Sequence, residues 1–138
     1  MSTEQSPVQK RKTLPPSHIL VVDDEPILLD MASTMLKRLG CTVDVAENGR
    51  EALNIYTQKK DKIHIVILDM IMPILDGKET FLELQKINPD LKVLLASGFS
   101  LDAEAQILLS QGVSGFLQKP FRMHELYNKL ADILEPEP

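Results

Sequence analysis

The sequence has little of what a disulfide-linked, zinc-structured or membrane-spanning protein needs. Cys41 is the only cysteine among 138 residues, which excludes an internal disulfide framework and a zinc site built on several cysteines. The longest apolar runs, among them Ile19–Val22 and Ile65–Leu68, are far shorter than the roughly 20 residues of a membrane-spanning helix. Residues 1–17 are mostly polar and contain no apolar signal-peptide segment. These absences predict a reduced, cytoplasmic protein without membrane insertion.

The composition is that of one globular domain. Apolar residues make up 43% of the chain and charged residues 25%, so the chain is too apolar to stay disordered. The net charge of −5 is unevenly placed, because residues 1–17 carry +2 and the remainder −7. An acidic body of this kind predicts no direct contact with nucleic acid. The polar, proline-containing start predicts a flexible leader over 1–17, followed by one domain over 18–134 and a short tail over 135–138.

Short apolar runs and helical patterns alternate along the domain. The apolar runs predict buried strands, and the alternation of Val43 and Val45 with polar residues predicts a half-exposed edge strand. The expected strands are Ile19–Val22, Thr42–Ala46, Ile63–Leu68, Val93–Ala96 and Gly115–Leu117. A helical pattern follows each of them. This order predicts an α/β fold, with a parallel sheet covered by helices on both faces.

The first predicted helix has apolar residues that recur every four positions. That spacing predicts a stripe that faces the core. The stripe consists of Ile27, Met31, Met35 and Leu39, and Leu28, Ala32 and Leu36 widen it. Gly40 is expected to end the helix. For these methionines, core packing is a better interpretation than a methionine-rich partner groove.

Polar side chains follow four of the five predicted strands, at the edge of a parallel sheet where ligands bind. They are Asp23 and Asp24, then Asp69, Ser97 and Lys119. Clustered carboxylates need a cation or raised pKa values, and oxygen ligands without histidine or cysteine favour Mg²⁺ or Ca²⁺. Any one of these residues alone is explained by helix capping or surface charge. Together they are suited to phosphoryl transfer to a carboxylate, with Ser97 and Lys119 as donors to phosphate oxygens.

The motifs that contain these residues resemble the receiver domain of two-component response regulators over about residues 18–134. They are Val21-Val22-Asp23-Asp24-Glu25-Pro26, Ile67-Leu68-Asp69-Met70-Ile71-Met72-Pro73 with Asp76-Gly77, Ala96-Ser97-Gly98, and Gly115-Phe116-Leu117-Gln118-Lys119-Pro120-Phe121. The resemblance implies a flavodoxin-like (βα)5 three-layer sandwich. Its five-stranded parallel sheet would have the strand order 2-1-3-4-5.

The resemblance also implies a role for each residue at the strand ends. Asp69 would be the phosphoacceptor, and Ser97 and Lys119 would bind the phosphoryl oxygens. Mg²⁺ would be held by Asp24, Asp69 and the backbone carbonyl of Ile71, with Asp23 helping through water. A cis peptide bond is implied between Lys119 and Pro120.

Two further expectations concern the switch and its duration. The resemblance implies that Ser97 and Phe116 change position on activation, although many relatives have a tyrosine where this chain has Phe116. Ile71 and Phe99 would flank the path of the hydrolytic water. Neither side chain can orient that water by a hydrogen bond, so we expect a long-lived phosphorylated form.

The implied partners are a sensor histidine kinase or histidine phosphotransfer domain as phosphodonor, and a downstream protein. The latter would bind the face formed by the fourth helix, fifth strand and fifth helix; a homodimer is also possible. The chain would be a switch rather than an enzyme, because it assists only its own phosphorylation and dephosphorylation. The leader and the sequence motifs around Ser97 and Lys119 are most similar to those of receivers at the C-terminus of hybrid sensor kinases. A stand-alone regulator is the alternative.

Three other classes of protein fit the pattern less well. A haloacid-dehalogenase-type phosphatase needs a second acid two residues after its nucleophile, where this chain has Ile71. A flavodoxin-type carrier needs a phosphate loop after the first strand, where Asp23 and Asp24 would repel the phosphate. An interaction module that has lost signalling would not need the complete set of acids, hydroxyl and lysine.

Overall fold

The computed structural model describes residues 13–72, 74–98 and 103–135, and strands and helices alternate along them. The strands are β2 (His18–Val22), β3 (Thr42–Ala46), β4 (Ile65–Asp69), β5 (Lys92–Ser97) and β6 (Gly115–Gln118). The helices are α2 (Pro26–Arg38), α3 (Gly49–Lys59), α4 (Gly77–Ile87), α5 (Ala103–Ser110) and α6 (Met123–Leu134). No helix among these residues is long and apolar enough to cross a membrane.

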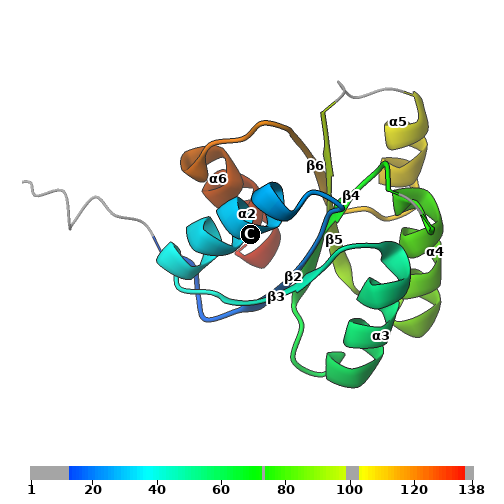
Figure 1. Cartoon of the computed structure of the whole chain (residues 1–138), viewed down its shortest axis with the longest axis horizontal. Helices are drawn as coiled ribbons and strands as arrows, with labels where there is room; N and C mark the ends of the chain where they lie inside the picture. Colours follow the sequence, from blue (N-terminus) through cyan, green and yellow to red (C-terminus); the bar gives the residue numbers. More distant parts are fainter. Residues whose placement is uncertain (1–12, 73, 99–102, 136–138) are drawn as a thin grey trace, which may run out of the picture.

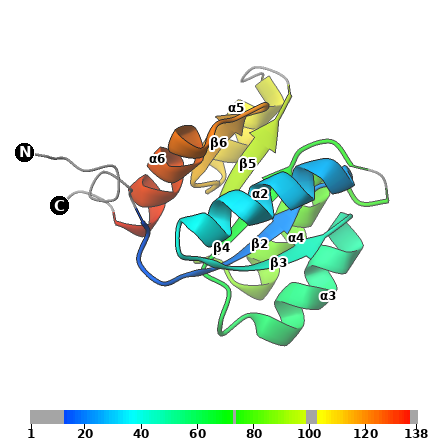
Figure 2. The same cartoon turned by 60° about the vertical axis from the view of Figure 1, so that its left-hand side comes forward.

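The strands form one parallel sheet with the order β3-β2-β4-β5-β6. Numbered along the chain, this is the predicted order 2-1-3-4-5, and the flavodoxin-like fold is confirmed. Helices α2 and α6 cover one face of the sheet, and α3, α4 and α5 cover the other (Figures 1 and 2). The edge strand Thr42–Ala46 has the predicted bounds.

Each face of the sheet has its own hydrophobic core, because neighbouring residues of a strand point to opposite faces. In the central strand β4, Val66 and Leu68 pack toward α3, α4 and α5, whereas Ile65 and Ile67 pack toward α2 and α6. All residues of β4 are buried. Burial of an aliphatic side chain of this size contributes roughly 1.5–3 kcal/mol, so the strand that ends in Asp69 is among the most firmly held parts of the sheet.

The face that α2 buries agrees only in part with the predicted stripe. Ile27 is 75% exposed and Met31 is 47% exposed, so the prediction that they face the core is wrong. Ala32, Leu36 and Leu39 are buried as predicted, and Leu29 is buried as well. Apolar residues lie on more than one side of this helix, so helical spacing alone made the predicted stripe too wide. The helix ends at Arg38, and Gly40 follows with a φ of 94°, as predicted.

Two predicted boundaries also need correction. The third strand begins at Ile65 rather than Ile63, because the N–H of Ile63 donates to the carbonyl of Lys59 and so completes the turn after α3. The packed chain begins before His18, because Leu14 is buried and its N–H donates to the carbonyl of Leu39 at 2.8 Å. Residues 13–17 are therefore not part of a free leader.

Gly77, the first residue of α4, lies directly against the end of β4. A Cβ atom added there would lie 2.5 Å from the carbonyl oxygen of Asp69 and 2.6 Å from the Cα of Met70. The N–H of Gly77 also donates to the carbonyl of Met70 at 2.9 Å. This helix start can approach the strand so closely only because residue 77 has no side chain.

We therefore expect Gly77→Ala to lower the free energy of unfolding by roughly 1–3 kcal/mol, the usual cost of overpacking. Urea unfolding followed by circular dichroism measures this change. The matched control is Gly98→Ala, where an added Cβ has no neighbour within 4 Å. Equal stabilities of the two variants would contradict this account of the contact.

Candidate functional site

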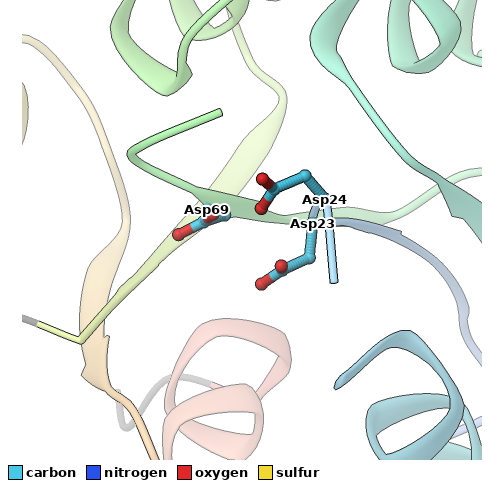
Figure 3. A group of neighbouring side chains, drawn as sticks. All are labelled: Asp23, Asp24 and Asp69. Carbon is cyan, nitrogen blue, oxygen red and sulfur yellow. The ribbon is translucent and has the colours of Figure 1, made fainter. Parts of the chain in front are cut away.

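Three aspartates meet where β2 and β4 end. Asp69 is the last residue of β4, and Asp23 and Asp24 directly follow β2. The register pairs Val22 with Leu68, so the residues that come next, Asp23 and Asp69, leave their strands at the same level. One carboxylate oxygen from each aspartate lies within 4.8 Å of those of the other two. Figure 3 shows the three side chains together at this edge of the sheet.

The backbone around Asp23 shows that these residues do not simply cap the next helix. Asp23 and Asp69 are buried, whereas Asp24 is exposed. Glu25 occupies the N-cap position of α2, and its side chain makes no capping hydrogen bond. Asp23 Oδ1 accepts the N–H of Glu25 at 3.0 Å, which leaves Oδ2 for other partners. The carboxylate is thus fixed at the site.

Lys119, just beyond β6, places its ammonium group between two of the acids. Its Nζ donates to Asp23 Oδ2 at 2.9 Å and to Asp69 Oδ1 at 3.3 Å. The exposed carboxylate of Glu25 lies farther away, 3.9 Å from Nζ. The N–H of Lys119 donates to the carbonyl of Ser97 at 2.7 Å, which ties the ends of β5 and β6 together. The Lys119–Pro120 bond is cis, as predicted.

Burial and neighbouring charges change the acid–base properties of this cluster. Loss of hydration, with the negative charge of Asp23, raises the pKa of Asp69 to about 6, and Lys119 offsets only part of that shift. Burial by itself would lower the pKa of Lys119, but the hydrogen bond to Asp23 and the charge of Asp69 outweigh it and raise that pKa. One ammonium group among three aspartates leaves the site short of positive charge.

This donor set fits a hard divalent cation. The oxygens that converge are carboxylates, and no histidine or cysteine belongs to the group. Such ligands favour Mg²⁺ or Ca²⁺ over transition metals. The small number of carboxylates suits Mg²⁺, which usually keeps several waters.

The other predicted site residues lie on or near the same edge. Ser97 ends β5 and is buried. Ile71 lies two residues after Asp69, and 61% of it is exposed. Phe116, on β6, is half-buried and packs against the core beneath α3, α4 and α5. Phe99 and Pro73 lie outside the described residues.

The sequence reasoning missed the contact between Gly77 and the end of β4. The Asp76-Gly77 pair marks a helix start, and the structure confirms that Asp76 caps α4 by accepting the N–H of Glu79 at 2.9 Å. Nothing in the sequence, however, shows how near Asp69 that helix begins. The same holds for Glu25, whose proximity to Lys119 depends on how α2 leaves the sheet.

Comparison with known proteins assigns this fold and site to a family. Residues 19–131 match the family described as "Response regulator receiver domain". The chain therefore belongs to the response regulator receiver domains, the receiving modules of two-component signalling.

Individual relatives agree with this assignment. The transcriptional regulatory protein GlrR of Escherichia coli (strain K12) is 36% identical over 120 residues, which are 87% of this chain and 27% of that protein. The sensor kinase CckA of Brucella abortus (strain 2308) is 35% identical over 119 residues, 86% of this chain and 13% of that protein. A structure of the response regulator TrrA from Thermotoga maritima in complex with Mg²⁺–BeF is 34% identical with a TM-score of 0.76, over 86% of this chain and 99% of that one.

The chain thus spans only a part of the curated relatives it matches, 27% and 13% of these two. The predicted absence of nucleic-acid contact finds no support in these comparisons, because GlrR is a transcriptional regulatory protein. The acidic net charge on which that prediction was based is a property of this chain and does not describe the longer relatives.

Because the pKa of Asp69 is raised, we expect the metal-free protein to become less stable as the pH rises. A carboxyl group with a pKa near 6 in the folded chain and about 3.9 in the unfolded chain destabilises the fold increasingly as the pH rises from 4 to 6. In EDTA, Asp69→Asn should therefore raise the free energy of unfolding at pH 7.5 by roughly 1–3 kcal/mol. The gain should vanish near pH 4.

Chemical unfolding of both proteins across this pH range is the measurement. Asp24→Asn, at the exposed member of the cluster, is the control and should give a smaller gain. A gain for Asp69→Asn that does not depend on pH would mean that ionisation of Asp69 is not its cause.

Proposed function

We propose that this receiver domain takes a phosphoryl group from a phosphohistidine onto the carboxylate of Asp69, with Mg²⁺ at the acidic cluster. The observation that carries the proposal is the position of the Lys119 ammonium group, 2.9 Å from Asp23 and 3.3 Å from Asp69. The ammonium group and the three clustered aspartates supply the positive charge, the metal ligands and the nucleophile that this transfer needs. Membership of the receiver family supports the same assignment.

In the proposed reaction, an oxygen of Asp69 forms a bond to phosphorus as the bond between phosphorus and the histidine nitrogen breaks. The electron pair of the broken bond leaves with the imidazole. Lys119 would exchange its contact with Asp69 Oδ1 for one with a phosphoryl oxygen, and the Ser97 hydroxyl would hold another. Asp24, Asp69 and the carbonyl of Ile71 would hold Mg²⁺, with Asp23 helping through water, and the ion would neutralise negative charge on the phosphoryl oxygens.

Phosphorylation would bias a surface formed by α5, β6 and α6. Ser97 and Phe116 lie on the adjacent strands β5 and β6, whose register pairs Leu95 with Phe116. A groove of about 400 Å³ opens beside Phe116 and is lined by Phe116, Leu117, Gln118, Glu125, Asn128 and Lys129. This groove is where we place the downstream protein, so a movement of Phe116 would change the surface that the target meets.

The wider setting is also part of the proposal. The domain would act in the cytoplasm as a switch rather than as an enzyme. A sensor histidine kinase or a histidine phosphotransfer domain would be its phosphodonor. The match to the sensor kinase CckA supports a place in a hybrid kinase, whereas the match to GlrR supports a separate regulator. A kinase domain encoded in the same reading frame would decide for the hybrid kinase.

The phosphoacceptor is tested with a small donor that needs no partner protein. Incubation with acetyl phosphate and Mg²⁺ should add one phosphoryl group, detected by intact-protein mass spectrometry. Asp69→Asn should abolish the addition, because an amide oxygen cannot form the acyl phosphate. Asp76→Asn, which changes a capping aspartate outside the acidic cluster, is the control. Equal labelling of Asp69→Asn and the wild type would show that Asp69 is not the phosphoacceptor.

The lifetime of the phosphorylated form should depend on the side chain at position 71. Ile71 offers no hydrogen bond to a hydrolytic water, whereas an amide there could orient one. Ile71→Asn should therefore shorten the lifetime, by up to roughly 10²-fold, without much change in Mg²⁺ affinity. Decay after removal of the donor is the measurement.

The control for this experiment is Ile74→Asn, which places the same amide on another exposed residue of the loop. If both variants decay at the wild-type rate, Ile71 does not control access of the water. Failure of this test leaves the assignment of Asp69 intact.

A further inference from the structure

Glu25 adds a fourth acid to the edge of the sheet that holds Asp69. It occupies the N-cap position of α2, yet its side chain makes no capping hydrogen bond. The side chain is 69% exposed, and its ion-pair partner among the residues that the structure describes is Lys119, whose Nζ lies 3.9 Å from Oε1. Capping therefore does not explain why this carboxylate lies at the rim of the acidic cluster.

The carboxylate of Glu25 lies close enough to Asp69 for its charge to act there. Both side chains approach the Nζ atom of Lys119, which is 3.9 Å from Glu25 Oε1 and 3.3 Å from Asp69 Oδ1. These two oxygens are therefore less than roughly 8 Å apart, the distance over which physiological salt screens charges. Lys119 also donates to Asp23 at 2.9 Å, so the nearer aspartates use most of its positive charge.

The sign of the net charge at this site depends on Glu25. With Mg²⁺ at the acidic cluster, as proposed above, the formal charges of the three aspartates equal those of the ion and Lys119 together. Glu25 then makes the site negative, and without Glu25 it would be neutral. Without the ion the site is more negative still. A negative site repels an incoming phosphodonor more strongly when the donor itself carries more negative charge.

Phosphodonors differ in the charge that they bring. Acetyl phosphate is a dianion near neutral pH. Phosphoramidate has a protonated nitrogen on phosphorus and therefore a smaller net negative charge. A phosphohistidine has the same phosphorus–nitrogen bond, and its ring gains positive charge when it is protonated. A negative rim thus disfavours acyl phosphates more than donors with a phosphorus–nitrogen bond.

We propose that Glu25 is a specificity-determining residue that favours phosphohistidine-type donors over small acyl phosphates. The inference rests on the function proposed for Asp69 and adds the class of donor that the site accepts. With either donor, an oxygen of Asp69 forms a bond to phosphorus. Acetyl phosphate loses its phosphorus–oxygen bond and releases acetate, whereas phosphoramidate loses its phosphorus–nitrogen bond and releases ammonia. In each case the electron pair leaves with the departing group, and Glu25 acts only through its charge.

The ratio of the phosphorylation rates with acetyl phosphate and with phosphoramidate tests the proposal. Rates are measured on the purified full chain by intact-protein mass spectrometry, at saturating Mg²⁺ and low ionic strength. Glu25→Gln should raise the acetyl phosphate rate relative to the phosphoramidate rate roughly two- to fivefold, the range expected for one exposed charge. Glu25→Lys should raise the ratio further, because it reverses the charge. Added salt should reduce both effects.

The matched control is Asp61→Asn, which removes a negative charge from an exposed residue between α3 and β4, at the opposite edge of the sheet. This variant should keep the wild-type ratio. If Glu25 only stabilised the N-terminal end of α2, its replacement would lower stability in urea without changing the ratio. A weaker affinity for Mg²⁺, measured separately by titration, would change both rates together and would also leave the ratio unchanged.

The outcomes distinguish this proposal from the one for Asp69. A ratio that follows the charge at position 25 supports the role of Glu25. The same ratio in the wild type, Glu25→Gln and Glu25→Lys would overturn that role, as would an equal shift in Asp61→Asn. Labelling that is still lost in Asp69→Asn would then leave Asp69 as the phosphoacceptor. Absence of labelling with both donors would overturn both proposals.

Discussion

The contact of one ammonium group with two buried carboxylates organises the edge of the sheet that carries the acidic cluster. Lys119 lies just beyond β6, Asp23 just beyond β2 and Asp69 at the end of β4, so a single side chain connects three separate strands. Each acid would be costly to bury alone. The lysine lowers that cost without removing it, as the raised pKa of Asp69 shows. The sheet can hold this arrangement because its interior strands are packed on both faces.

The same site holds the proposed phosphoacceptor on a rigid support. Asp69 belongs to a fully buried strand, and the first residue of α4 packs against its carbonyl. The two residues proposed to interact with the phosphoryl group from the other side, Ser97 and Lys119, are joined through the backbone. In the proposed switch, this backbone hydrogen bond would make the ends of β5 and β6 move together.

Much of the fold could be predicted from the sequence because its strands carry unambiguous signals. Apolar runs such as Ile65–Leu68 are typical of strands buried on both faces, and the alternation of strands and helices predicts a parallel sheet. The strand order was implied only by the resemblance to receiver domains. The site followed from topology as well, since Asp23, Asp69 and Lys119 lie at the carboxyl ends of parallel strands, which meet at one edge of the sheet. The full rotation of α2 could not be predicted, because Ile27 and Met31 continue the apolar spacing of the buried residues Ala32, Leu36 and Leu39 but are exposed. Nor could the approach of Gly77 to Asp69, which depends on the direction in which a loop returns.

Leu14 has a consequence for where the domain begins. It is buried in the core that α2 and α6 cover, and its N–H donates to the carbonyl of Leu39, just after α2. A chain cut at His18, where the sequence alone places the domain boundary, would keep every strand and helix but would uncover part of that core and leave the carbonyl of Leu39 without this donor.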